Sequence, residues 1–194
     1  MNENHPQLWS AVDFAHLCLE RYVKPNGRLV DATAGNGHDA LFLLDLLDDH
    51  GQLLALDIQQ AAVELTMQRL QHHKRSAQAE VLCANHAALR TILQSKGWNA
   101  IHGAVMNCGY LPGGDKAIRT DALSTVAAVK TLVEFCTHGG VIVIVCYVGH
   151  EGGTEECDRV EDCIRALPKE EYQSAVYSNQ GRNNAPRCYV IQRR

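Results

Sequence analysis

The chain has 194 residues, of which 46% are hydrophobic, so it is long and apolar enough to form one domain with a substantial core. Its formal net charge of −4 excludes an overall positive field that attracts nucleic acid, although a local basic patch would be enough for an RNA substrate. No apolar run approaches the roughly 18 residues of a membrane span, and the first residues lack a signal-peptide pattern, so we expect a cytoplasmic protein without membrane contact.

The eight cysteines contain no C-x-x-C pair, and the ten histidines are scattered along the chain. Cys83-Ala-Asn-His86 by itself is too weak a pattern for a metal site. We therefore expect reduced cysteines that pack as small apolar side chains, and no bound metal.

The first predicted element is a helix over residues 6–22, where apolar residues recur at helical spacing until Pro25-Asn-Gly27 ends it. We expect the segment 1–24 to cover either the sheet or the mouth of a ligand site. A strand over residues 28–33 follows it, and a helix is predicted over residues 38–47.

A glycine turn joins this strand to its helix. The strand carries Asp31 near its end, and the turn contains Gly35 and Gly37, which can adopt positive φ and let a ligand approach the backbone amides. The next predicted strand, residues 52–57, ends in Asp57. In doubly wound α/β sheets an acid at this place binds ribose hydroxyls, so the pattern indicates a nucleotide-like ligand.

The turn reads Ala-Gly-Asn-Gly rather than the G-x-G-x-x-G that a dinucleotide pyrophosphate favours. An acid after each of the first two strands suits S-adenosyl-L-methionine, which has a ribose, an adenine and a charged amino acid but no phosphate. Two alternatives remain: an NAD-dependent oxidoreductase that shares the Asp57 contact, and a nucleotide-binding module without catalysis.

The rest of the chain continues to alternate between helices and strands. Five strand–helix alternations followed by two strands predict an α/β fold with a mainly parallel seven-stranded sheet, helices on both faces and a C-terminal antiparallel hairpin. The unusual loops all follow strands, so we expect them to gather at the carboxyl edge of the sheet. The remaining helices are predicted at 61–74, 89–96, 120–136 (capped by Gly139-Gly140) and 154–167 (capped by Thr154), and the remaining strands at 80–84, 99–106, 141–147, 172–178 and 188–192.

The loop after the fourth strand begins Asn107-Cys-Gly-Tyr110, which is similar to the Asn-Pro-Pro-Tyr motif of amino-group methyltransferases. In that motif the asparagine oxygen and a backbone carbonyl accept hydrogen bonds from an amine and aim its lone pair, while the aromatic ring stacks on the target base. Cys108-Gly109 replaces the two prolines, so this loop is less stiff. A glycine-rich turn with a buried tyrosine is the alternative interpretation.

Four motifs together resemble one small family: Asp31-Ala-Thr-Ala-Gly-Asn-Gly-His-Asp39, Asp57-Ile-Gln59, Asn107-Cys-Gly-Tyr-Leu-Pro-Gly-Gly-Asp115, and Tyr147-Val-Gly-His-Glu-Gly-Gly153 with Glu155. These are the bacterial tRNA wobble-uridine methyltransferases that act on 5-aminomethyl-2-thiouridine, formerly labelled "putative rRNA methylase". The resemblance implies a Rossmann-like class I fold, S-adenosyl-L-methionine as cofactor and a homodimer. It also implies 5-methylaminomethyl-2-thiouridine as product, in the tRNA anticodon stem-loop; an rRNA or a small amine is the alternative substrate.

The resemblance also implies roles for individual residues. Asn107 orients the substrate amine, and Tyr110 stacks on the base. The amine must lose a proton, and His150 is the first choice as acceptor because its unperturbed pKa of about 6.5 leaves it largely neutral at pH 7. Asp115 and Glu151 are the alternatives.

For the cofactor, the ribose is expected on Asp57 with Gln59 beside it, the adenine beside Asn85 and His86, and the methionine end on Asp31, Asn36 and Asp39. The full predicted cofactor-binding set is Asp31, Thr33, Gly35, Asn36, Gly37, Asp39, Asp57, Gln59, Asn85 and His86. RNA phosphates are expected to contact Lys116, Arg119, Arg182 and Arg187.

Overall fold

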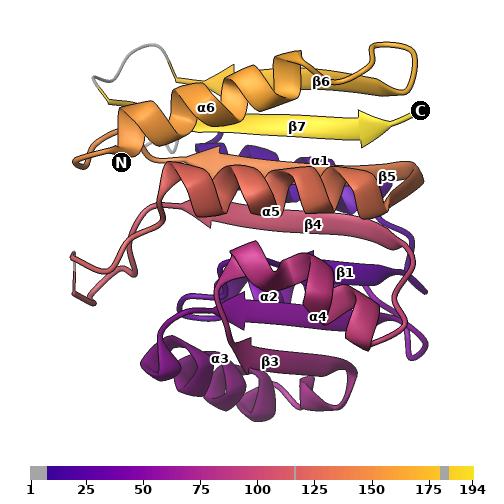
Figure 1. Cartoon of the computed structure of the whole chain (residues 1–194). Helices are drawn as coiled ribbons and strands as arrows, with labels where there is room; N and C mark the ends of the chain where they lie inside the picture. Colours follow the sequence, from indigo (N-terminus) through magenta and orange to yellow (C-terminus); the bar gives the residue numbers. More distant parts are fainter. Residues whose placement is uncertain (1–7, 116, 180–183) are drawn as a thin grey trace, which may run out of the picture.

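The computed structural model describes residues 8–115, 117–179 and 184–194, and its centre is a seven-stranded sheet in the order β3-β2-β1-β4-β5-β7-β6 (Figure 1). The first five strands run parallel, and β7 is antiparallel to both β5 and β6. The predicted sheet with its C-terminal antiparallel hairpin is therefore confirmed. The strands are β1 (Arg28–Asp31), β2 (Gln52–Asp57), β3 (Ala79–Cys83), β4 (Ile101–Cys108), β5 (Cys136–Cys146), β6 (Tyr172–Ser178) and β7 (Arg187–Arg193).

Helices cover both faces of the sheet. In Figure 1, α4 (Leu89–Ser95), α5 (Ala122–Phe135) and α6 (Gly153–Arg165) lie in front, and α1 (Ala11–Tyr22) and α2 (His38–Asp45) lie behind. Leu70 of α3 (Gln60–His72) packs in the same core cluster as α1 and α2. Two short 3₁₀ turns, η1 (Ser76–Gln78) and η2 (His86–Ala88), flank β3. None of the described helices is long and apolar enough to cross a membrane.

The apolar run of β5 explains why it lies between two helical layers. Val143 packs in the core with α1 and α2, whereas Ile142 and Ile144 pack in the core with α4, α5 and α6. A strand that is buried on both faces needs apolar residues at successive positions rather than alternating ones. The burial of β5 and its pairing with β4 hold both strands in place in the core. The loops after these two strands carry several of the residues that the sequence singled out.

Helix α1 begins at Ala11 rather than at residue 6, which corrects the predicted start. Ser10 forms a capping box with Asp13: the Asp13 amide donates to Ser10 Oγ at 3.1 Å, and the Ser10 amide donates to the Asp13 carboxylate at 3.0 Å. This reciprocal pair satisfies backbone amides that have no partner within the helix, so the helix starts there.

Three other local expectations were wrong. Gly139 and Gly140 do not cap α5 but lie inside β5, where residues 136 and 141 pair with residues 101 and 103 of β4 and the strand bulges. Thr154 is not a cap, because Gly152 with φ 80° takes the N-cap position of α6. Asn107 belongs to the end of β4 and not to a loop, so the sheet itself holds its backbone.

Candidate active site

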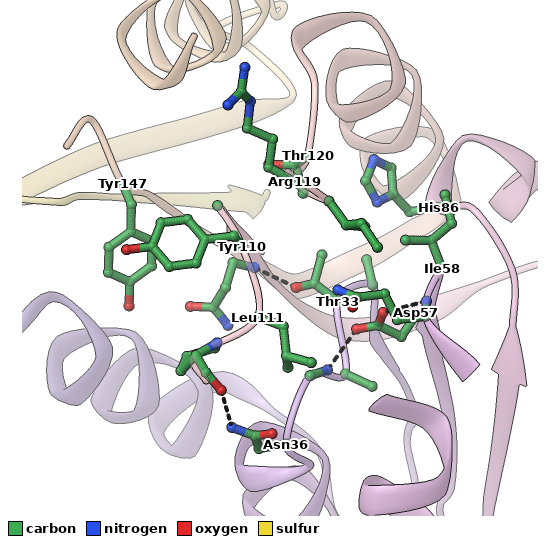
Figure 2. A pocket seen from close by; sticks show the side chains of 18 of the residues that line it. Thr33, Asn36, Asp57, Ile58, His86, Tyr110, Leu111, Arg119, Thr120 and Tyr147 are labelled. Carbon is green, nitrogen blue, oxygen red and sulfur yellow. Dashed lines mark hydrogen bonds between the residues drawn. The ribbon is translucent and has the colours of Figure 1, made fainter. Parts of the chain in front are cut away.

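A cavity of about 840 Å³ opens at the carboxyl edge of the parallel strands (Figure 2). Its volume is within the range of about 300–1,000 Å³ that is common for small-molecule sites. The loops after β1, β2, β3, β4 and β5 all contribute to its wall. The structure brings together in that wall these residues that the sequence singled out: Thr33, Gly35, Asn36, Asp39, Asp57, Gln59, Asn85, His86, Asn107, Tyr110, Arg119 and His150.

Five of the singled-out residues within the described ranges lie outside the cavity wall. Two of them, the alternative proton acceptors Asp115 and Glu151, are exposed. Asp31 is fully buried, Gly37 lies at the N-terminus of α2, and Arg187 pairs with acids of α6, at 3.4 Å from Asp158 and 3.3 Å from Glu161. Lys116 and Arg182 lie outside the described residues.

Asp57 links the ends of β1 and β2. One carboxylate oxygen accepts a hydrogen bond from the Gly35 amide and the other from the Gln59 amide, both at 2.9 Å (Figure 2). Gly35 has φ +54°, a conformation that glycine adopts without strain. The two amides fix the carboxylate at the cavity wall, where its remaining lone pairs can accept hydrogen bonds from ligand hydroxyls.

The glycine turn is supported from α3. A Cβ on Gly37 would lie 2.9 Å from Thr66 Cα, and the Thr66 hydroxyl donates to the Gly35 carbonyl at 3.2 Å. The Arg69 Nε group donates to the Asn36 carbonyl at 2.7 Å. Gly37 therefore acts through close packing of the turn on α3, which explains its place outside the wall.

The loop after β4 folds over the same turn. Asn36 Nδ2 donates to the Pro112 carbonyl at 3.4 Å, and the Leu111 side chain lies 3.5 Å from the position that a Cβ on Gly35 would take (Figure 2). Leu111 and Ile58 give this part of the wall an apolar surface, which the sequence motifs did not indicate.

Acidic groups surround the glycine turn. Burial raises the pKa of Asp31 well above its usual value, and the nearby carboxylates of Asp39 and Asp57 raise it further. One Asp31 oxygen accepts from the Thr33 amide at 3.1 Å, while the other has no partner among the described residues. Such a surrounding favours a cationic group in the neighbouring cavity.

Asn85 and His86 follow β3 and line the cavity together with Asp57. Asn85 Oδ1 accepts from the Ala87 amide at 2.8 Å and so caps η2, which places the His86 ring at the cavity. Burial lowers the pKa of His86, so the ring is neutral, and its Nε2 atom has no partner within the described part of the chain. A neutral ring with an unused nitrogen suits a nucleobase edge.

Asn107 is held at two points. Its backbone amide donates to Thr33 Oγ1 at 2.7 Å, and its side-chain Nδ2 donates to Asp39 Oδ2 at 2.5 Å. The other Asp39 oxygen lies 2.6 Å from His16 Nε2, a contact from α1 that the sequence did not indicate. Since Asp39 uses the amide nitrogen, the carbonyl oxygen of Asn107 is the side-chain atom left to accept a hydrogen bond from a ligand.

The loops after β4 and β5 contact each other beside Asn107. The ring of Tyr110 meets the ring of His150 edge-on, with centroids 6.0 Å apart, and Arg119 pairs with Glu151 at 3.1 Å. Tyr147 also lines the cavity, and burial raises its pKa (Figure 2). The sequence motif contained Tyr147 but assigned it no role.

Both ring nitrogens of His150 lie close to atoms of the loop after β5, although the residue lines the cavity. Nδ1 lies 3.1 Å from the Glu151 carbonyl oxygen, which can only accept, so a hydrogen bond here requires a proton on Nδ1 and leaves Nε2 as the other ring nitrogen. Nε2 is buried and lies 2.9 Å from the position that a Cβ on Gly153 would take. Nε2 of His150 thus lies against its own loop and not at the open cavity.

Glu156 of α6, which follows the loop after β5, makes hydrogen bonds to the segment that follows the loop after β4. It is only 2% exposed and accepts hydrogen bonds from Thr120 Oγ1 at 2.9 Å and Thr125 Oγ1 at 2.5 Å. The Thr120 amide donates to the Gly109 carbonyl at 2.9 Å, so this buried acid supports the segment that carries Tyr110. Burial raises the pKa of Glu156.

Residues 53–193 match the family model described as "Putative rRNA methylase". The "tRNA (mnm(5)s(2)U34)-methyltransferase, chloroplastic" of Arabidopsis thaliana is 32% identical over 186 residues, which cover 91% of this chain and 66% of the plant protein. The chain thus spans slightly less than two thirds of that relative. The ribosomal RNA small subunit methyltransferase H of Lactiplantibacillus plantarum is 31% identical over 98 residues, 50% of this chain and 31% of that protein.

Solved structures share the whole fold. A crystal structure of a protein described as a putative rRNA-methylase from Clostridium thermocellum has a TM-score of 0.91 at 25% identity and covers 97% of this chain and 100% of its own. A putative methyltransferase from Streptococcus mutans, in complex with SAH, has a TM-score of 0.85 at 24% identity over 97% of this chain and 100% of its own. The predicted Rossmann-like methyltransferase fold is confirmed.

Proposed function

The chain belongs to the family described as "Putative rRNA methylase", and from this premise we propose that it is an S-adenosyl-L-methionine-dependent N-methyltransferase. Its proposed reaction converts 5-aminomethyl-2-thiouridine to 5-methylaminomethyl-2-thiouridine at the wobble position of tRNA. The observation that carries this proposal is the Asn107 carboxamide, held by Asp39 and Thr33 with its carbonyl oxygen left for an amine. The name of the plant relative supports the choice of nucleoside.

The residues at the cavity fit the proposed cofactor. Asp57 is a fixed acceptor for two ribose hydroxyls, and the neutral His86 ring suits the adenine edge. The carboxylate of Asp39 lines the cavity and can attract the methionine ammonium and the sulfonium, while Asp31 is buried behind the wall with one unpartnered oxygen. When bound, the cofactor supplies an electrophilic methyl group.

The reaction itself depends mainly on positioning, because methyl transfer to an amine needs an aligned lone pair more than acid catalysis. Asn107 Oδ1 accepts a hydrogen bond from the substrate nitrogen and so directs its lone pair. Tyr110 stacks on the thiouracil ring, and the apolar side chain of Leu111 excludes water from the reacting atoms. The substrate ammonium must lose a proton first, and His150, Asp115 and Glu151 are the predicted acceptors. Because Nε2 of His150 is buried within its own loop, we propose that the proton reaches an acceptor through water rather than by direct transfer to His150.

A second candidate substrate is ribosomal RNA. The description of the family model and the name of the relative from Lactiplantibacillus plantarum both refer to rRNA. Family membership argues against the oxidoreductase and the non-catalytic alternatives, and a thermal-shift comparison of S-adenosylhomocysteine with NAD tests this directly. Stabilisation by NAD alone would contradict the proposal.

The decisive experiment is methyl transfer in vitro. Purified protein with labelled S-adenosyl-L-methionine is offered tRNA that carries 5-aminomethyl-2-thiouridine, the same tRNA with an unmodified wobble uridine, rRNA, and free amines, and the nucleosides are analysed by mass spectrometry. We expect label only in 5-methylaminomethyl-2-thiouridine of the first substrate. The variant Asn107→Ala should bind S-adenosylhomocysteine normally but lose transfer. Label in rRNA alone would establish the second candidate.

The remaining proposals follow from the same function. The substrate-binding surface is assigned to Arg119, Lys116, Arg182 and Arg187, the location to the cytoplasm, the assembly to a homodimer and residues 1–194 to a single methyltransferase domain. The last three rest on the family resemblance and on the composition of the chain. Light scattering of the purified protein tests the assembly; a monomeric mass would reject the homodimer.

A further inference from the structure

The side chain of Asp39 connects two elements that are far apart in the sequence. Its Oδ2 atom accepts from Asn107 Nδ2 of β4 at 2.5 Å, and its Oδ1 atom lies 2.6 Å from His16 Nε2 of α1. Asp39 itself lies in the first turn of α2 and lines the cavity. One carboxylate thus joins the N-terminal helix to the residue that is proposed to hold the substrate amine.

The orientation of His16 is set by a second contact. Its ring stacks on Phe42 with centroids 3.8 Å apart and planes inclined by 7°. Asp39 and Phe42 are three residues apart on α2, so they lie on the same helix face, and the stacked ring directs Nε2 to the carboxylate. The side chain of His16 is 26% exposed and that of Asp39 is 15% exposed, so water competes only weakly for this hydrogen bond.

This contact matters because a carboxamide can rotate by 180° with almost no change of shape, which exchanges its oxygen and nitrogen. Only its hydrogen-bond partners decide which atom faces the ligand. An ionised carboxylate accepts and never donates, so Asp39 retains Asn107 Nδ2 and turns Oδ1 away from itself. A carboxylate that is free to rotate would hold the amide less strictly, and the His16 contact removes this freedom.

We propose that His16 is a positioning residue of the methyltransferase: it holds Asp39, and Asp39 in turn fixes the Asn107 carboxamide with its oxygen directed to the substrate amine. The inference rests on the proposed function for the role of Asn107. It assigns Asp39 primarily to the substrate side of the site, in addition to its place near the methionine end of the cofactor. The geometry of the relay itself can be observed without any turnover.

The first test is kinetic and uses single turnovers with the wobble-modified tRNA. His16→Phe keeps an aromatic ring on Phe42 but removes the hydrogen bond to Asp39, and we expect the transfer rate to fall by about 10²-fold, the loss typical of a misplaced reacting group, while affinity for S-adenosylhomocysteine stays unchanged. His16→Gln retains a donor and should recover part of the rate. Exposed His72 provides the control His72→Phe, which should react at the wild-type rate.

A double-mutant comparison separates a relay from a general structural effect. If His16 acts through Asn107, His16→Phe should have almost no further effect on the residual rate of Asn107→Ala, because residues in one chain of contacts are not additive. A full additional loss in the Asn107→Ala background would overturn the proposal. An unchanged rate in His16→Phe alone would overturn it as well.

The second test reads the relay by NMR. In the wild type we expect the Asn107 side-chain amide protons to be protected from exchange and the His16 Nε2 atom to carry a proton; in His16→Phe the amide protection should be lost. Unprotected amide protons in the wild type would contradict the relay whatever the activity. Absence of methyl transfer together with protected protons would instead reject the proposed function and leave the relay intact.

Discussion

The Gly35 amide donates a hydrogen bond to the Asp57 carboxylate at 2.9 Å and thereby joins the glycine turn after β1 to the end of β2. This hydrogen bond makes one structural unit of two features: the acid that is expected to bind ribose, and the turn whose backbone amides are expected to contact the ligand. A change at either residue should therefore affect the position of the other.

Asp57→Ala should lower the affinity for S-adenosylhomocysteine by about 100-fold. Two hydrogen bonds from ribose hydroxyls to a charged acceptor at about 1.5 kcal/mol each account for this loss, since 1.4 kcal/mol corresponds to a factor of ten. Isothermal titration calorimetry measures it, and the variant of exposed Asp49, Asp49→Ala, serves as control. Equal dissociation constants for Asp57→Ala and the wild type would place the ribose elsewhere.

Gly37→Ala should destabilise the protein more than Gly97→Ala. Both glycines have positive φ, +77° and +66°, so both alanines incur backbone strain of about 1–3 kcal/mol. Only Gly37 is also tightly packed, with Thr66 Cα 2.9 Å from the position that a Cβ would take, whereas nothing lies within 4 Å of that position at Gly97. Urea unfolding should therefore show an extra loss of at least about 1 kcal/mol for Gly37→Ala, as expected for overpacking; equal losses would show that α3 yields easily.

Glu156→Gln should change how stability depends on pH. Because burial raises the pKa of Glu156 in the folded state, its contribution to stability is complete below the unfolded pKa and is lost as pH rises through the folded pKa. The glutamine does not ionise, so as pH rises above the ordinary glutamate pKa of 4.5 the variant should lose less stability than the wild type in urea unfolding. Glu155→Gln, at an exposed neighbour, should keep the wild-type slope, and parallel slopes for all three proteins would contradict the assignment.

Arg119→Ala and Arg187→Ala should affect tRNA binding differently. Arg119 lines the cavity and pairs with the exposed Glu151, whereas Arg187 is paired with two acids of α6, Asp158 and Glu161. Loss of one phosphate contact should reduce the slope of log K against log salt by about 1 for Arg119→Ala. Arg187→Ala should change this slope less; filter-binding titrations at several salt concentrations decide, and a larger effect at Arg187 would shift the RNA surface towards β7.

The alternation of strands and helices was sufficient to predict the sheet, because apolar runs bounded by turns are local signals. The boundaries depended on contacts that the periodicity does not contain. Helix α1 extends only from Ala11 because the Ser10–Asp13 capping box stops it, and β5 begins before its glycines because Cys136 pairs with Ile101 across the sheet. Such pairing between strands far apart in the sequence leaves no mark on either segment alone.

The site could be predicted at the carboxyl ends of strands and in the loops that follow them, where unusual residues stand. Asp57, Gly35 and Asn107 are of this kind, and the structure places them around one cavity. His16 gave no signal, because one histidine on an amphipathic helix is ordinary and its partner lies 23 positions away.

Sequence reasoning also missed Glu156 and Asp121, and only one of the two carries a signal in the sequence. Glu156 meets Thr125 only after α5 and α6 have packed together, so no local pattern indicates this contact. Asp121, which caps α5 and lines the cavity, could have been found, since an aspartate before an apolar helical period is a known start signal.

The position of β7 between β5 and β6 constrains the order in which the sheet assembles. Among the described strands, β6 pairs only with β7, although β6 precedes β7 in the chain. Tyr172–Ser178 therefore stays an unpaired strand, open to aggregation, until Arg187–Arg193 has docked on β5. Substitutions that weaken the pairing of β7 with β5 should thus leave two strands unpaired at once and raise aggregation during refolding.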